Sequence, residues 1–167
     1  MSHRRDFDVV VVGAGFAGST FARVAAQQGA CGLLLENSSD VGQVVHSTGV
    51  LIAEVLELTH IPQSILLDPV HTFHIYPPDR RRIALNGPGF RYWMSNPAGL
   101  LRGLAEAATA AGSELQTDAR FTQAQSNSGG VIVTCCGSFS CEACCIRCRL
   151  ERQCLVCCGS ACRAWAG

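Results

Sequence analysis

A glycine motif between two apolar runs constrains the fold of this chain more than any other feature. Residues 8–13 read Asp-Val-Val-Val-Val-Gly, and residues 31–36 read Cys-Gly-Leu-Leu-Leu-Glu. Between them, residues 13–18 read Gly-Ala-Gly-Phe-Ala-Gly, and apolar residues at helical spacing follow as far as Gly29. Short continuous apolar runs are typical of parallel strands that are buried on both faces. The segment therefore predicts a strand, a glycine turn, a helix and a second strand.

Each glycine of the motif has its own physical role in such a unit. Gly13 is expected to make the tight turn, Gly15 to let the backbone approach a pyrophosphate, and Gly18 to let the helix lie close to the strand. The positive end of the helix offers free N–H groups to phosphate oxygens. Glu36 ends the second run, where it can accept hydrogen bonds from ribose hydroxyls and disfavours the 2′-phosphate of NADP. The pattern predicts dinucleotide binding, and by itself it does not separate FAD from NAD.

Residues 6 to about 140 resemble a known flavoprotein family. The segment DVVVVGAGFAGSTFARVAAQQGACGLLLE, followed by NSSDVGQ and HSTG, resembles the FAD-dependent oxidoreductases of the geranylgeranyl reductase type, which are related to flavin monooxygenases and halogenases. The resemblance implies an α/β fold: a Rossmann-like FAD-binding βαβ unit with an inserted small sheet and helices, here incomplete. It also implies hydride transfer through FAD to a C=C bond of an isoprenoid or other hydrophobic substrate, with an unidentified electron donor.

The resemblance further implies which residues bind FAD. The glycines would hold the pyrophosphate and Glu36 the ribose, while the Val41-Gly42 turn and the Ser-Thr-Gly segment would lie along the flavin. The expected cofactor-binding residues are Gly13, Ala14, Gly15, Phe16, Ala17, Gly18, Glu36, Asn37, Gly42, Ser47, Thr48 and Gly49. Phe16 departs from the usual Pro of the family, and Asn96 stands where the family often has an FAD-contacting Arg, so that contact is not carried over. No catalytic residue is predicted.

The middle of the chain predicts further elements. We expect a helix over 50–58, a helix that begins at Asn96-Pro97 and stops at Gly112, and Cys31 as a small core residue. Strands are expected over 70–76, 83–85, 114–117, 120–125 and 131–135. His71 and His74 lie three apart on a predicted strand, so they point to opposite faces and should not share a metal. Residues 80–82, three arginines, are expected to be a solvated turn, with an anion site for a diphosphate headgroup as the alternative, and His46 a polar loop residue.

Ten of the eleven cysteines lie between Cys135 and Cys162. Cys141 and Cys144, like Cys154 and Cys157, have the spacing of thiolate metal ligands. A metal site is disfavoured because several cysteines are adjacent to one another and no single set of ligand pairs dominates. A one-base frame shift turns Cys codons into Ala or Val codons, which would restore the strand that the family has here. We therefore expect residues 141–167 to be an out-of-frame, disordered tail on a truncated chain, with a metal-binding appendage as the alternative.

Composition sets further limits. Thirteen basic residues, all Arg, balance thirteen acidic residues, so no charge excess favours nucleic acid as a partner. No run approaches the roughly 20 apolar residues of a membrane span, and no secretion signal is present, which predicts a cytoplasmic protein and leaves peripheral membrane contact open. We expect residues 1–140 to form a partial FAD-binding domain and residues 141–167 the tail. The alternative functions are a non-enzymatic fragment, a Cys-rich metal-binding module on a nucleotide-binding unit, and an NAD-binding domain.

Overall fold

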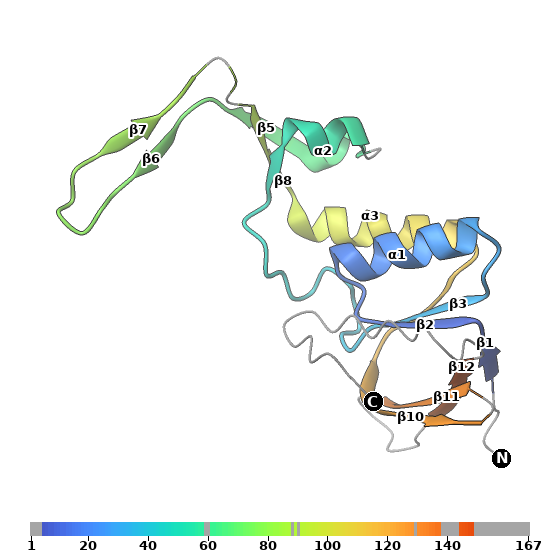
Figure 1. Ribbon diagram of the computed structural model, residues 1–167. Helices are drawn as coiled ribbons and strands as arrows, with labels where there is room; N and C mark the ends of the chain where they lie inside the picture. Colours follow the sequence, from blue (N-terminus) through green and yellow to red (C-terminus); the bar gives the residue numbers. More distant parts are fainter. Residues whose placement is uncertain are drawn as a thin grey trace. The chain divides into compact units, whose positions relative to one another are not determined.

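The chain forms two compact units. The structure, a computed structural model, describes residues 5–58, 61–87, 89, 91–128, 130–137 and 144–148 (Figure 1). One unit comprises the described residues within 1–44 and 101–167, and the other comprises those within 45–100. The boundary falls inside the helix α3 (Pro97–Ala110).

A parallel sheet is the centre of the first unit. Its strands β2 (Val9–Val12), β3 (Gly32–Leu35) and β9 (Glu114–Gln116) lie in the order β2-β3-β9, and all run parallel. The helix α1 (Phe16–Gln27) connects β2 to β3. Every residue of β2 and β3 is buried, as the continuous apolar runs predict. The strand, glycine turn, helix and strand expected from the sequence are confirmed.

Side chains alternate along β2 and β3 between two cores. One core packs Val9, Val11 and Leu34 against Ala22 of α1 and Ala108 of α3. The other core joins the opposite face of the sheet to a second sheet, through Val10, Val12, Leu33, Leu35, Phe7, Ala119, Val133 and Cys135. The first unit therefore has helices on one face of the parallel sheet and strands on the other (Figure 1).

The second sheet of this unit has four strands in the order β1-β12-β11-β10. Their bounds are β1 (Arg5–Phe7), β10 (Ala119–Asn127), β11 (Gly130–Gly137) and β12 (Cys144–Cys148). The strands β10 and β11 form the antiparallel hairpin that the sequence predicts, while β12 pairs parallel with β1 and antiparallel with β11.

The Cys-rich segment is therefore not wholly disordered. Residues 144–148 form the strand β12, which corrects the expectation of a disordered tail over these residues. The physical reason is that β12 pairs with β1 and β11 through backbone hydrogen-bonding groups, which do not depend on the side chains that the strand carries. The rest of the expected tail, including Cys141, Cys154 and Cys157, lies outside the described residues.

The second unit is built from short strands and helices. It contains β4 (Val50–Ile52), α2 (Ala53–Leu58), a 3-10 turn η1 (Gln63–Ile65), β5 (Leu66–Val70), β6 (Phe73–Ile75), β7 (Ile83–Leu85) and β8 (Tyr92–Ser95). The strands β4, β8 and β5 form one antiparallel sheet, and β6 and β7 form a separate hairpin. This hairpin was predicted; the strand expected over 70–76 is divided between β5 and β6.

Two local expectations are wrong. The helix predicted over 50–58 begins only at Ala53, because Val50–Ile52 pairs with β8 as a strand. Cys31 is exposed rather than a core residue, because β3 begins one residue later, at Gly32. The backbone N–H of Cys31 donates to Oδ2 of Asp8 at 2.8 Å.

The helix α3 begins and ends where the sequence predicts. Oδ1 of Asn96 accepts from the backbone N–H of Gly99 at 3.1 Å, which satisfies one of the free donors at the helix start. Gly112 lies beyond the helix end with φ +112°, a conformation that favours glycine. No helix in the described ranges is long and apolar enough to cross a membrane.

Candidate nucleotide-binding site

The glycine turn at the end of β2 has the geometry of a tight strand-to-helix connection. Gly13 has φ +94°, a left-handed value that non-glycine residues rarely adopt. Its N–H donates to the carbonyl oxygen of Leu35 at 2.7 Å, which fixes the turn to the end of β3. Gly13 therefore has the turning role that the sequence assigns to it.

Gly18 is required by close packing within the protein. A Cβ atom at this position would lie 2.0 Å from the carbonyl oxygen of Gly13 and 3.3 Å from Cγ1 of Val11. The first contact is with backbone, which cannot move aside without changing the turn. The close approach of helix and strand expected at Gly18 is present.

Gly15 differs from the other two glycines because the protein itself does not require it. Its φ of −75° suits any residue, and a Cβ atom there would meet nothing within 4 Å. The residue is exposed and forms the N-cap of α1, with no side chain capping the helix. A glycine with free space in front of it fits the close approach of an external group such as a pyrophosphate.

The first turn of α1 can supply donors to such a group. The N–H groups of the first helical residues lack intrahelical acceptors, and the helix dipole makes this end positive. Phe16 and Ala17 are exposed there, whereas Ala14 is buried. The backbone is therefore open to an anion at the helix start, while the preceding turn is fixed in the core.

Glu36 has a structural role that the sequence does not reveal. Its Oε2 accepts from the N–H of Ala14 at 2.9 Å, and its Oε1 accepts from the N–H of Ser38 at 2.9 Å. The carboxylate thus ties the glycine turn to the loop that follows β3. A carboxylate has about four acceptor positions, so these two bonds leave acceptor capacity for ribose hydroxyls.

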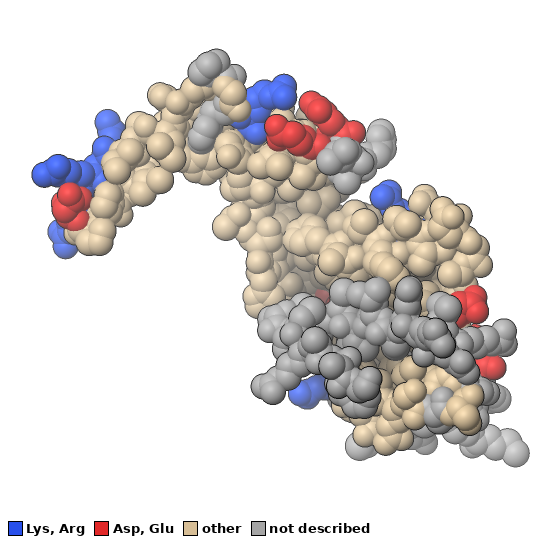
Figure 2. All heavy atoms as spheres, in the orientation of Figure 1, with Lys and Arg blue, Asp and Glu red and all other residues tan. Residues whose placement is uncertain are grey.

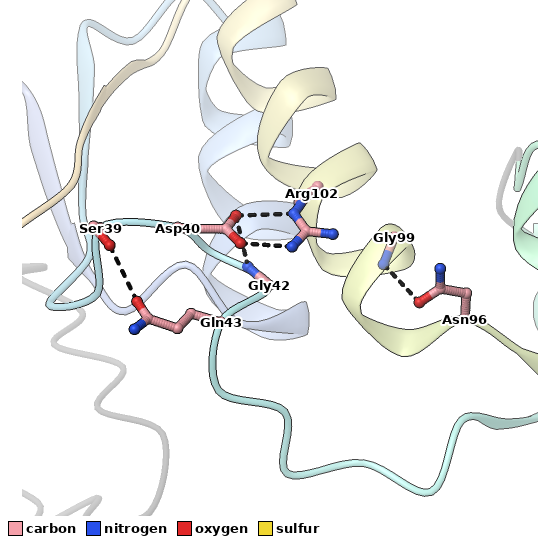
Figure 3. A network of polar contacts seen from close by, with 7 residues as sticks. All are labelled: Ser39, Asp40, Gly42, Gln43, Asn96, Gly99 and Arg102. Carbon is pink, nitrogen blue, oxygen red and sulfur yellow. Dashed lines mark hydrogen bonds and ion pairs between the residues drawn. The ribbon is translucent and has the colours of Figure 1, made fainter.

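The loop after Glu36 is held by a second carboxylate. Asp40 forms a two-pronged ion pair with Arg102 of α3, with Nε to Oδ1 at 2.9 Å and Nη2 to Oδ2 at 2.5 Å (Figure 3). Its Oδ1 also accepts from the N–H of Gly42 at 3.2 Å. The hydrogen bonds from Arg102, and then from Gly42, lower the pKa of Asp40 from 3.8 to about 2. The carboxylate is therefore ionised at neutral pH.

A cavity of about 220 Å³ adjoins this ion pair. Its lining includes Asp40, Arg102, Glu106 and Thr117. No local sequence pattern indicates this cavity, because Asp40 and Arg102 lie 62 residues apart. Asn37 lies in the same loop, between Glu36 and Ser38.

The segment of Ser47, Thr48 and Gly49 belongs to the second unit. Gly49 has φ +73°, and a Cβ atom there would lie 2.8 Å from the carbonyl oxygen of Ser95. Its N–H donates to Oγ of Ser47 at 3.2 Å, and its carbonyl oxygen accepts from both N and Oγ of Ser95 at 2.8 Å. The segment has a fixed local conformation, and its contact with flavin stays a prediction. The same is true of the predicted cofactor contacts in the first unit.

The remaining candidates that lie among the described residues form no site. No group of three or more His, Cys, Asp or Glu residues in the described part of the chain could hold a metal ion. Charged side chains gather at the tip of the β6–β7 hairpin (Figure 2). There Arg80 to Arg82 are exposed, and Arg81 pairs with Asp79 at 3.2 Å. Their surroundings are those of a solvated turn.

The fold and the turn define an α/β protein with a Rossmann-like nucleotide-binding unit. Residues 11–83 match the family described as NAD(P)-binding Rossmann-like domain. A Methanosarcina barkeri protein, named as the uncharacterized protein in the nifH2 5′ region, is 32% identical over 131 residues, which cover 70% of this chain and 68% of the relative. The chain belongs to the same family as this protein.

Solved structures share the fold. A geranylgeranyl bacteriochlorophyll reductase-like protein from Thermoplasma acidophilum superposes with a TM-score of 0.75 at 24% identity, over 87% of this chain and 38% of that one. A flavoprotein/dehydrogenase from Cytophaga hutchinsonii gives 0.67 at 16% identity, over 87% and 38%. The myxobacterial FAD-dependent halogenase CndH gives 0.63 at 13% identity, over 86% and 36%. This chain therefore spans less than two fifths of these solved relatives.

Proposed function

We propose that this chain binds FAD through its glycine turn and forms the FAD-binding portion of a flavin-dependent oxidoreductase. The observation that carries the proposal is Gly15, whose missing side chain leaves space that no described residue fills, directly before the N-terminus of α1. The FAD-dependent relatives with the same fold support FAD as the nucleotide.

Each part of the turn would have a defined task. The N–H groups at the start of α1 would bind the pyrophosphate, and Glu36 would accept from the ribose hydroxyls. Gly13 and Gly18 would keep the turn close to the sheet, so that both contacts are made by a rigid backbone. Bound FAD would supply the two-electron redox chemistry.

Within this class, we propose an activity of the geranylgeranyl reductase type. The support is the sequence resemblance together with the reductase-like protein among the solved relatives. The substrate would then be a small hydrophobic molecule with a C=C bond, which receives a hydride and a proton. A separate donor would supply the electrons.

The proposed function is tested by equilibrium dialysis of the purified chain against FAD, NAD and NADP in parallel. We expect one FAD bound per chain, with NAD much weaker and NADP weakest, because Glu36 would repel a 2′-phosphate. Glu36→Gln should weaken FAD binding, since an amide nitrogen would then face a hydroxyl or an N–H donor. Tight NAD binding without FAD binding would contradict the proposal.

NAD is the second candidate, and one specific observation favours it. The family that matches residues 11–83 is described by NAD(P) binding. FAD and NAD share the adenosine and the pyrophosphate, so the contacts of the glycine turn do not distinguish them. The same dialysis does, because it measures the binding of each whole nucleotide.

A further inference from the structure

We propose that Asp40 and Arg102 form a positioning clamp, which holds the loop 37–43 in its binding conformation before the nucleotide arrives. This inference rests on the proposed function, because it assigns a role to the clamp in FAD binding. Neither residue belongs to the expected cofactor contacts, and both act through the loop.

The geometry of the pair is that of a directional clamp. Two bonds, Nε to Oδ1 and Nη2 to Oδ2, join the guanidinium to both oxygens of the carboxylate (Figure 3). The bond from the N–H of Gly42 to Oδ1 of Asp40 fixes the loop backbone to the same carboxylate. Arg102 therefore holds Asp40, and Asp40 holds the turn at Gly42.

The clamp completes a chain of carboxylate contacts that begins at the glycine turn. Glu36 binds the N–H groups of Ala14 and Ser38, which fixes the start of the loop. The carbonyl oxygen of Ser38 accepts from the N–H of Asp118 at 3.1 Å. Past Ser38, where Val41 also packs against the core cluster that includes Ala108, the Asp40–Arg102 pair is a polar contact that joins the loop to α3. Its loss should loosen the second half of the loop and leave the first half attached.

Exposure distinguishes this role from a role in global stability. The side chains of Arg102 and Asp40 are 47% and 43% exposed, and exposed ion pairs add little to the stability of a fold. A pair of this kind can still order the loop that it joins. Ordering a binding loop in advance lowers the entropic cost of binding. The hydrogen bonds that Arg102 and Gly42 donate to the Asp40 carboxylate are also what lowers its pKa.

The experiment compares Arg102→Gln and Asp40→Asn with the matched control Arg120→Gln, which removes an exposed arginine from β10 of the same unit. Hydrogen exchange of the ligand-free protein is the first readout. We expect amide exchange in residues 40–43 to rise about tenfold in both clamp variants, with no change in β2 or β3 and none in the control. Unchanged exchange in residues 40–43 would overturn the clamp.

The second readout is the dissociation constant for FAD, measured at low and at high salt. We expect it to rise about fivefold to tenfold in both clamp variants at low salt, and the difference from wild type to shrink at high salt, where the pair is screened. A looser loop with unchanged FAD affinity would overturn the role in binding. A wild-type chain that binds no FAD would overturn both the proposed function and the role of the clamp in FAD binding. The exchange experiment would still show whether the Asp40–Arg102 pair orders the loop.

Discussion

The two units differ in how their strands are stabilised. In the first unit, all residues of β2 and β3 are buried between two layers. In the second unit, every residue of β7 and two of the three in β6 are exposed. Among the described residues of 45–100, the buried apolar side chains are those of Ala53 and Leu100. Both units contain strands, but one of them contains most of the described core.

This difference bears on function because the glycine turn belongs to the buried sheet. Gly13 is bonded to Leu35, and Glu36 directly follows the buried strand β3. The core that stabilises the fold therefore also fixes the backbone that would bind the nucleotide. Substitutions of buried residues that hold the glycine turn to the sheet should affect stability and binding together, whereas those in the β6–β7 hairpin should affect neither strongly.

Gly18→Val should have the largest effect. The added side chain would collide with the carbonyl oxygen of Gly13, and relief of this contact requires α1 to move away from β2. We expect a loss of about 3 kcal/mol or more in the free energy of unfolding, measured by urea denaturation, together with loss of FAD binding. The control is Ala17→Val, at an exposed position of the same helical turn. Equal stability of the two variants would contradict the close packing described here.

Leu34→Ala tests the unequal cores directly. Leu34 is fully buried, and the truncation of a buried leucine costs about 2–5 kcal/mol. The matched variant in the other unit is Ile83→Ala, at a side chain that is 47% exposed, where we expect about 1 kcal/mol or less. Similar losses in urea denaturation would mean that the second unit is stabilised as strongly as the first.

Asn96→Ala should have an intermediate effect, at the helix that the two units share. The variant leaves the N–H of Gly99 without its acceptor, and the loss of an N-cap typically costs about 1 kcal/mol. Asn96→Asp should retain most of the stability, since Asp caps equally well. Thermal unfolding followed by circular dichroism measures both variants, and an Asp variant as unstable as the Ala variant would exclude capping as the cause.

The smallest effect is expected at the tip of the hairpin. Arg81 and Asp79 form an ion pair there, and their side chains are 84% and 55% exposed, respectively. Arg81→Ala should therefore leave the unfolding midpoint and FAD affinity unchanged within error. A clear loss of FAD affinity in this variant would show that the hairpin takes part in binding.

The sequence predicts features that depend on neighbouring residues. The buried strands, the positive φ of Gly13 and the N-cap at Asn96 all follow from short-range patterns. The β6–β7 hairpin is also predicted, because its strands are close in sequence.

Features that depend on distant partners could not be predicted. Asp40 meets Arg102 only after α3 has packed beside the parallel sheet, and no local pattern marks either residue. Glu36 is a recognisable acid at a strand end, yet its bond to Ala14 depends on how β2 and β3 align. Val50–Ile52 becomes a strand because it pairs with β8, whose residues lie 40 to 44 positions later in the chain.

A fluorescence titration of FAD with the wild-type chain and with Gly15→Ala shows whether the open space at Gly15 receives the pyrophosphate of FAD. The variant adds one methyl group where the described residues leave open space, at a φ that alanine adopts freely, so the free energy of unfolding should change by about 1 kcal/mol or less, the cost of alanine at an N-cap. We predict saturable binding of one FAD by the wild type, and an affinity at least about tenfold lower in the variant, because the methyl group would occupy the space of the pyrophosphate. Absence of binding by the wild type, or equal affinity in the two proteins, would contradict the account.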